Sequence, residues 1–405
     1  MYWQRKPNSS GLITIPFGFV KFSKKNESDV MKSIILINII IFSYVYLPAQ
    51  NSSRLRDYGI KIGTYEVGKY NAITDVEGVN VGHFTLVKDD NIRTGVTAVL
   101  PYSGNIFMNK VPAAMYVANG FGKLTGYTQV EELGEIETPI ILTNTLSVPT
   151  AADALIDYIL SLGDNRKYVR SINPIVGETN DGFLNDIQGR YLTKENVIEA
   201  IKNATSGLVE EGSVGAGTGT ICFGYKGGIG TSSRILPKER GGYTVGVLVQ
   251  TNFGGNLTVA GIPVGEELKN QKKLNSGDGS CMIIVATDAP ITSRNLKRLA
   301  KRAIFGIAKT GGHCSNGSGE YVIAFSTTKD LRVPYYSPNN DFLAIQELRN
   351  DKMTPLFEAV IEATEEAVLN SLFTSNTVTG KNGLTIKKLP IDKVIKILKH
   401  HKILE

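Results

Sequence analysis

The stretch NSGDGSCMIIVAT, residues 275–287, decides the fold and the chemistry that we expect from this chain. Its glycine-rich first half is typical of a turn, and its second half is an apolar run of the length that forms a strand buried on both faces. Ser280 is therefore expected at the first position of a core strand, directly after the turn.

Glycine residues before Ser280 allow backbone conformations that residues with a Cβ avoid. We expect such a backbone to expose the Gly279 carbonyl to the Ser280 hydroxyl, so that the chain cuts itself at Gly279–Ser280. The cut would leave Ser280 with a free α-amine, which puts a nucleophile and a potential base in one residue. A plain β-turn that enters a core strand is the alternative interpretation of this stretch.

The segments that follow Ser280 alternate between strand and helix patterns. A strand over 281–287 precedes helical spacing over 293–309 and a second strand over 320–326. Because the helix carries the chain back, both strands should begin at the same edge of a sheet, and the fold class is α/β. Further strands are predicted at 96–100, 138–144 and 243–250, and further helices at 150–162 with Thr150 as its cap, at 194–204 and from Thr354 to Leu369.

The shared sheet edge predicts a constellation of polar side chains around Ser280. The turn before the second strand holds Ser318 and Glu320, and Asn252 follows the strand at 243–250. A hydroxyl and a carboxylate beside the new α-amine, whose reference pKa is about 8, would orient it and set its protonation state. The amide of Asn252 is a candidate donor to an oxyanion. Each of these side chains is also an ordinary residue of a turn or strand edge.

Composition excludes several other classes of protein. The 405 residues are 42% hydrophobic and 20% charged, as in a globular protein. The net charge is +6, and its basic residues gather near both ends without interleaved aromatic residues, so we expect no nucleic-acid partner. The glycine-rich segment 211–230 matches neither a dinucleotide-binding fingerprint nor a phosphate-binding loop.

The small number of cysteine and histidine residues argues against a metal site and against a Ser-His-Asp triad. Three cysteines form no CxxC pair, and no HExxH motif is present, so we expect no metal and no cofactor. A Ser-His-Asp triad would have to use His83 or His313, and no G-x-S-x-G motif accompanies them. Cys281 is expected to be a core residue, because its side chain should point away from that of Ser280 along the strand. His313 and Cys314 are adjacent in the sequence, and adjacent residues rarely form a working nucleophile–base pair.

The segment MKSIILINIIIFSYVYLPAQN, residues 31–51, has the basic start, short apolar run and small-residue exit of a secretory signal peptide. We expect a signal peptide over 31–50, with residues 1–30 an upstream extension before the true start at Met31. The mature protein would then be periplasmic or secreted, without stable membrane insertion. An uncleaved anchor with a basic cytoplasmic arm is the alternative.

Five motifs occur in the order that a known family has them: ITDVEGVNVGH (73–83), GETNDGFLND (177–186), VQTNFG (249–254), GDGS (277–280) and GSGE (317–320). The chain resembles the L-aminopeptidase/D-esterase family, which includes the beta-peptidyl aminopeptidases. The likeness runs from about residue 55 to about residue 375, so a chance match is excluded by its length.

The resemblance implies a four-layer α/β/β/α sandwich, autoprocessed into two chains that stay together. The single catalytic domain would span 51–375, with an α chain of about 51–279 and a β chain from Ser280. Residues 376–405, with apolar positions at Ile391, Val394, Ile395 and Leu398, look like a basic helical extension outside the family core. We also expect a homo-oligomer of such αβ units.

The resemblance also implies the roles of the site residues. Ser280 matches the family nucleophile, Ser318 and Glu320 match the serine and glutamate behind it, and Asn252 matches the oxyanion asparagine. Asn180 is the substrate-binding candidate in the segment 178–186. The implied activity is the release of N-terminal residues from short peptides, amides or esters through an acyl-enzyme on Ser280, without a metal or organic cofactor.

Two other functions fit parts of the sequence. An acyltransferase of the ornithine acetyltransferase type also cleaves itself, but it uses threonine as its nucleophile, whereas the junction here is Gly279–Ser280. An inactive exported binding protein with the same fold would remain a single chain.

Overall fold

Two β-sheets organise residues 53–268, 279–338 and 340–405, the parts of the chain that the computed structural model describes. The expected signal peptide at 31–50, the upstream extension 1–30 and residues 275–278 of the glycine-rich turn lie outside these ranges. The first sheet has the order β1 (Asn80–Lys88), β2 (Ile92–Leu100), β5 (Ile140–Asn144) and β6 (Ile175–Thr179). The second has the order β13 (Val333–Pro334), β3 (Asn109–Gly120), β12 (Gly319–Ser326), β11 (Ser280–Thr287), β10 (Thr244–Asn252) and β9 (Ile229–Ile235), and β4 (Glu135–Ile136) pairs with β3.

Strand β11 is apolar throughout because both faces of its sheet are covered. Cys281, Ile283 and Val285 belong to a core shared with helices, whereas Met282 and Ile284 belong to a second core shared with the first sheet. The alternation of side chains along a strand sends neighbouring residues to these two cores. The continuous apolar run is therefore a consequence of burial on both sides.

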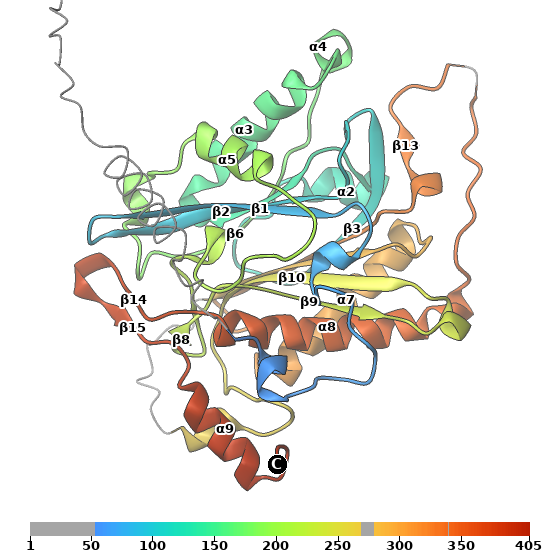
Figure 1. Ribbon diagram of the computed structural model, residues 1–405. Coiled ribbons are helices and arrows are strands. Elements are labelled where there is room, and N and C mark those ends of the chain that lie inside the picture. Colours follow the sequence, from blue (N-terminus) through green and yellow to red (C-terminus); the bar gives the residue numbers. More distant parts are fainter. Residues whose placement is uncertain (1–52, 269–278, 339) are drawn as a thin grey trace, which may run out of the picture. The chain divides into compact units, whose positions relative to one another are not determined.

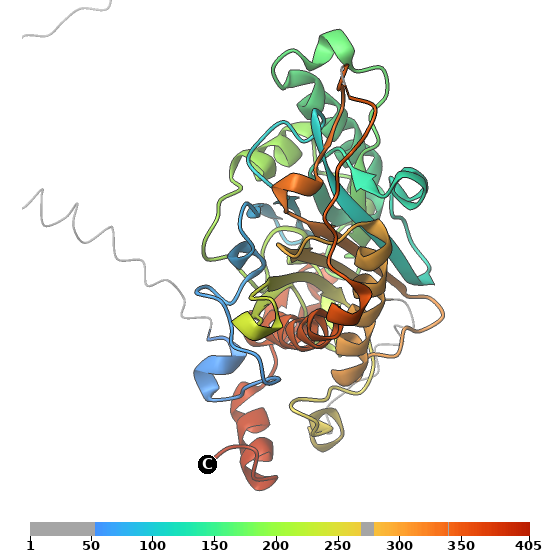
Figure 2. The same ribbon diagram turned by 90° about the vertical axis from the view of Figure 1, so that its right-hand side faces the viewer.

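Helices cover one face of each sheet (Figures 1 and 2). Helices α3 (Val148–Ser161) and α5 (Lys194–Lys202) pack against the first sheet, and α7 (Ser293–Lys309) and α8 (Thr354–Phe373) pack against the second. The remaining short elements are α2 (Tyr127–Leu133), α4 (Asn165–Tyr168), α6 (Val264–Glu267), α9 (Ile391–His400), β7 (Ile221–Cys222), β8 (Tyr225–Lys226), β14 (Val378–Thr379) and β15 (Thr385–Ile386). None of the described helices is both long and apolar enough to cross a membrane.

The strands and helices that the sequence predicts are confirmed, with differences at their ends. Helix α3 begins at Val148, so Thr150 lies inside its first turn and the prediction of Thr150 as its cap is wrong. Pro149 explains the earlier start, because proline fits the first turn of a helix, where no backbone donor is needed. Helix α8 continues beyond Leu369 to Phe373, since its last turn remains buried.

The C-terminal segment is only partly helical. Residues Ile391–His400 form α9, whereas residues 376–390 hold the β14–β15 hairpin. Val394 and Leu398 on α9 are fully buried in the same core as helices α7 and α8. The apolar positions that predict an amphipathic helix therefore contact the rest of the fold.

A buried ion-pair network ties the start of the described chain to α8. Arg234 on β9 has no exposed surface, and its guanidinium contacts Glu362 at 3.0 Å and Glu366 at 2.8 Å. Arg56 reaches the same Glu366 at 2.7 Å. A buried carboxylate without its cation lowers the stability of the folded state far more than an unpaired surface charge does. This network should therefore contribute strongly to the free energy of unfolding.

We expect Arg234→Met to lower the free energy of unfolding by about 3–5 kcal/mol, because it leaves the buried carboxylate of Glu362 without its cation and leaves Glu366 with Arg56 alone. Urea denaturation measures the change. Lys167→Met is the matched control, since it breaks an exposed pair with Asp164 and should cost less than about 1 kcal/mol. Equal losses in both variants would contradict the role of the network.

Candidate active site

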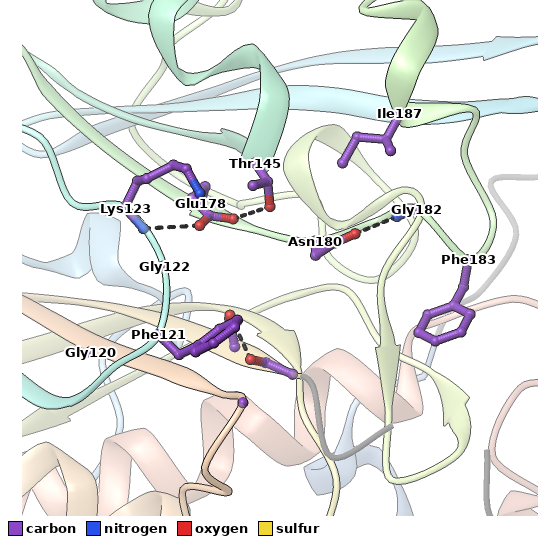
Figure 3. A pocket seen from close by; sticks show the side chains of 13 residues that line it. Gly120, Phe121, Gly122, Lys123, Thr145, Glu178, Asn180, Gly182, Phe183 and Ile187 are labelled. Atoms are coloured by element: carbon purple, nitrogen blue, oxygen red, sulfur yellow. Dashed lines mark hydrogen bonds between the residues drawn. The ribbon is translucent and has the colours of Figure 1, made fainter. Parts of the chain in front are cut away.

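A cavity of about 630 Å³ opens where strands of both sheets end. Ser280 and Gly279 line it at the start of β11. Glu178 and Asn180 line it at the end of β6 (Figure 3). The other lining residues are Gly120, Phe121, Gly122, Lys123, Thr145, Gly182, Phe183, Ile187 and Gly317. The cavity therefore combines a hydroxyl, a carboxylate and two aromatic rings in a space that admits a small ligand.

The register of β11 and β12 brings the predicted turns together. The two strands are parallel neighbours, and Ser280 pairs with Gly319. The Ser280 hydroxyl donates to the Gly279 carbonyl oxygen at 2.6 Å. The Gly319 N–H donates to the same carbonyl oxygen at 3.1 Å. The peptide carbonyl before Ser280 is thus polarised by two donors in a buried setting, as expected of an oxyanion site.

Gly279 is required by close packing. A Cβ at Gly279 would lie 2.6 Å from the Asn252 carbonyl oxygen and 2.7 Å from the Phe253 Cα, so no larger residue fits without movement of the backbone. The physical reason for glycine at this position is therefore close contact with the end of β10. The rest of the turn in which we expect unusual backbone conformations, residues 275–278, lies outside the described ranges.

Glu320 lies on the strand next to Ser280, and Ser318 immediately precedes that strand. The Ser318 hydroxyl donates to a Glu320 carboxylate oxygen, and both residues are buried. Glu320 pairs with Cys281, whose side chain faces the helices, whereas Ser280 is one position away and faces the first sheet. Burial raises the pKa of Glu320 above its ordinary value. The Glu320 carboxylate therefore lies on the opposite face of the sheet from the Ser280 side chain.

Asn252 is the direct neighbour of Ser280 across β10 and β11. Its amide Nδ2 donates to the Asn180 carbonyl oxygen at 2.9 Å, and its Oδ1 accepts from the Ile221 N–H at 2.9 Å. These two bonds fix the orientation of the amide, and they commit one of its two N–H groups. Asn252 also holds Asn180, whose own Oδ1 accepts from the Gly182 N–H at 2.9 Å.

Glu178 is the site residue that sequence reasoning missed. Its carboxylate accepts from the Lys123 N–H at 3.0 Å and from the Thr145 hydroxyl (Figure 3). Only 2% of the residue is exposed, and burial raises the pKa of its carboxyl group. Its neighbour Gly177 packs on Met282, where a Cβ would lie 2.3 Å from the methionine methyl group. Glu178 is the one glutamate of the motif at 177–186, which also contains Asp181 and Asp186, so the motif alone did not single it out.

None of the hydrogen bonds of the described residues pairs a histidine or cysteine side chain with the Ser280 hydroxyl. His313 Nε2 contacts the Ser315 hydroxyl at 3.2 Å, so it is not paired with Cys314. Burial raises the pKa of the Cys314 thiol to about 11, which argues against a nucleophilic thiolate. His83 Nδ1 lies 2.9 Å from the Thr97 hydroxyl on neighbouring strands of the first sheet. Within the described ranges no cluster of three His, Cys, Asp or Glu side chains could hold a metal ion.

Comparisons with known proteins agree with this geometry. Residues 71–386 match the model of a family described as Peptidase family S58. The chain is 42% identical over 374 residues to beta-peptidyl aminopeptidase BapA from Sphingosinicella microcystinivorans, which covers 86% of this chain and 92% of that protein.

Two solved structures are also similar. A beta-aminopeptidase from Burkholderia sp. superposes with a TM-score of 0.80 at 39% identity, over 86% of this chain and 99% of that one. The L-aminopeptidase D-Ala-esterase/amidase from Ochrobactrum anthropi, described as a prototype for the serine aminopeptidases and a variant of the Ntn hydrolase fold, has a TM-score of 0.81 at 34% identity, over 87% and 99%. The mixed α/β fold thus matches that of Ntn hydrolase-like aminopeptidases.

The environment of His83 predicts a loss of stability in acid. Burial lowers the pKa of His83 to about 4 from an unfolded value of 6.5, so the unfolded chain binds its proton more readily. The stability that depends on neutral His83 is complete above pH 6.5 and is lost as the pH falls toward 4, by up to about 3 kcal/mol. Denaturation of His83→Gln and the unmodified protein between pH 4 and 7 measures this loss. An equally steep fall in both proteins would contradict it.

Proposed function

Because the chain belongs to peptidase family S58 and is a serine aminopeptidase, we propose that it first cuts its own Gly279–Ser280 bond and then uses Ser280 as an N-terminal nucleophile. One observation carries this proposal. The Gly279 carbonyl oxygen accepts from both the Ser280 hydroxyl and the Gly319 N–H, so the carbonyl to be attacked is already polarised beside the attacking oxygen. The acyltransferase and binding-protein alternatives are not favoured by the relatives.

In the proposed self-cleavage, the Ser280 oxygen attacks the Gly279 carbonyl carbon and the Ser280 nitrogen leaves with a proton. The resulting ester joins the Gly279 acyl group to the Ser280 oxygen, and water hydrolyses it to a carboxylate and a free hydroxyl. The Gly319 N–H stabilises the negative charge on the carbonyl oxygen in both steps. The products are an α chain of about 51–279 and a β chain of 280–405.

In the proposed hydrolysis, a substrate carbonyl oxygen takes the position that the Gly279 oxygen leaves. The Ser280 oxygen attacks the substrate carbon, and the new α-amine accepts the hydroxyl proton and passes it to the departing amine. Ser318 and Glu320 hold that α-amine, and Asn252 together with the Gly319 N–H stabilises the oxyanion. Water then releases the acyl group from Ser280.

The carboxylate of Glu178 is proposed to bind the substrate's ammonium group, because an aminopeptidase needs a negative charge at a fixed distance from its nucleophile. Glu178 and Ser280 line the same cavity, and Asn180 borders it. Phe121 and Phe183 offer apolar surface for the substrate side chain. We propose short peptides, amides and esters as substrates, and β-aminoacyl compounds first among them, since two relatives are named for that activity.

Further properties are proposed from the sequence and the packing. The two helix layers that flank two stacked sheets support a four-layer α/β/β/α sandwich. We propose that the enzyme is periplasmic or secreted after loss of a signal peptide at 31–50, and that it is a homo-oligomer of αβ units. The exposed apolar side chains of Tyr336 and Phe342 support an association surface.

We expect Ser280→Ala to remain one uncut chain without peptidase activity, because the attacking oxygen is absent. Gly279→Ala should cut about 100-fold more slowly, since its Cβ would collide with the end of β10 and displace the carbonyl. Intact-mass analysis of freshly purified protein detects a β chain that begins at Ser280. Ser161→Ala, which removes an exposed hydroxyl, is the control. A cut and active Ser280→Ala protein would refute the scheme.

We expect Glu178→Gln to raise KM by about 30- to 100-fold, because the charge that pairs with the ammonium is lost while the shape is kept. Burial raises the pKa of Glu178, so kcat/KM of the unmodified enzyme should fall with acidity at a pH above the ordinary carboxylate range, and Glu178→Gln should lack that fall. Steady-state kinetics between pH 4 and 9 measure both effects. Glu131→Gln, at an exposed carboxylate, is the control. An unchanged KM for Glu178→Gln would remove this residue from the site.

A further inference from the structure

The loop 180–187, which follows β6, forms one wall of the cavity. The residues of this loop that line the cavity are Asn180, Gly182, Phe183 and Ile187 (Figure 3). Phe183 is 44% exposed, whereas the next residue, Leu184, has no exposed surface. The place of the Phe183 ring therefore depends on how the chain is held at Leu184.

Both ends of this loop are anchored to strand ends or turns. The Asn180 carbonyl oxygen accepts from the Asn252 amide at 2.9 Å, where β10 ends. The Asp186 N–H donates to the carbonyl oxygen of Asn91 at 2.8 Å, in the turn between β1 and β2. The middle of the loop, residues 182–184, needs a further support.

The β14–β15 hairpin contacts the middle of the loop through its backbone. The Lys381 N–H donates to the Leu184 carbonyl oxygen at 2.9 Å. A Cβ on Gly380 would lie 2.1 Å from the same oxygen, so the two backbones are in close contact there. The φ angle of Gly380 is −140°, outside the left-handed region. An alanine at this position would therefore introduce a collision with Leu184 and no left-handed strain.

Apolar side chains join the same two segments. Leu184 packs in a small cluster with the buried residues Ile221 and Ile386 and the partly buried residues Val378 and Leu384. Three of these four partners belong to the hairpin. Ile221 is held from elsewhere, because its N–H donates to Asn252 Oδ1 at 2.9 Å. The hairpin therefore supplies most of the apolar surface on which Leu184 rests.

The hairpin is itself attached to the rest of the fold on two sides. Arg93 on β2 donates from its Nε to the Thr379 carbonyl oxygen at 2.8 Å. The Lys226 N–H on β8 donates to the Lys387 carbonyl oxygen at 2.9 Å, just after β15 (Figure 1). These bonds connect the hairpin to the first sheet and to the β7–β8 pair, so it can transmit a fixed position to the loop.

We propose that the β14–β15 hairpin positions Phe183 and thereby sets the largest apolar side chain that the cavity accepts at the N-terminal residue of a substrate. This inference rests on the proposed function, in which Phe183 offers apolar surface to that side chain. The loop belongs to the α chain and the hairpin to the β chain of the proposed cut enzyme, so each chain contributes to this pocket. Gly380 and Leu384 are positioning residues, because they act on the substrate through the loop.

The test compares Gly380→Ala with the unmodified enzyme on the p-nitroanilides of β-alanine, β-homoleucine, L-alanine and L-leucine. The added Cβ has to displace the Leu184 carbonyl, and Phe183 moves with it. Loss of this apolar contact should raise KM for the two larger substrates about tenfold. KM for the two smaller ones, and kcat for all four, should change less than about twofold. Intact-mass analysis should still show complete self-cleavage, because Gly279 and Ser280 are untouched.

Leu384→Ala tests the same support without a backbone collision, because it removes only a half-buried side chain from the cluster. It should lower the ratio of kcat/KM for the larger over the smaller substrate about fivefold. Leu398→Ala is the matched control, since it makes the same change at a fully buried position of α9 in a different core. It should leave the ratio within about twofold. A merely structural role would lower stability in both variants and move the ratio in neither.

The series that the unmodified enzyme hydrolyses, β or L, decides the outcome. If Gly380→Ala and Leu384→Ala both cut themselves and keep the ratio, the inference is overturned and the proposed function stands. A shift in Leu398→Ala as large as that in Leu384→Ala overturns it in the same way. If Gly380→Ala does not fold, the comparison of Leu384→Ala with Leu398→Ala decides alone. If the unmodified enzyme cuts itself but hydrolyses none of the four anilides, the proposed function fails and the inference with it.

Discussion

The parallel pairing of β11 with β12 is the constraint on which the site depends. It sets Ser280 opposite Gly319, so the Gly319 N–H reaches the Gly279 carbonyl oxygen. It also sets Glu320 opposite Cys281, the residue that follows Ser280. Parallel pairing needs a crossover, which helix α7 supplies, and both faces of the pair must be covered, which explains its apolar composition. A shift of one residue in this register would turn every side chain to the other face.

Close contacts between the two sheets set the other half of the site. Gly177 on β6 packs against Met282 on β11, because a Cβ at Gly177 would meet the methionine methyl group at 2.3 Å. The next residue, Glu178, is therefore brought to the same cavity as Ser280. Gly122 plays a similar part, because a Cβ there would lie 2.9 Å from a Glu178 carboxylate oxygen and 3.1 Å from the Tyr321 hydroxyl. These glycines act through the absence of a side chain.

Local patterns identified β2, β5, β10, β11 and β12 and the helices α3, α5, α7 and α8, since apolar periodicity repeats over two to four residues and is readable without long-range contacts. They gave no prediction of β1, β3, β6 or β9. They were weaker at the ends, and Thr150 is an example, because Pro149 and not the hydroxyl marks the start of α3. They also failed over 376–390, which form a hairpin and not part of a helix. The motif at 277–280 includes Gly279, which the sequence explains by backbone freedom. The structure explains this glycine by its close contact with the end of β10.

The sequence by itself determined that Ser280 begins a core strand, that Ser318 and Glu320 begin another, and that both strands start at one sheet edge. Each of these statements follows from chain order and short periodicity. Only the tertiary structure decided that Glu178 and Tyr321 converge on Gly122, because these residues come from strands of different sheets and their distance depends on how the sheets pack. Contacts between layers have no period along the chain, so no local pattern reports them.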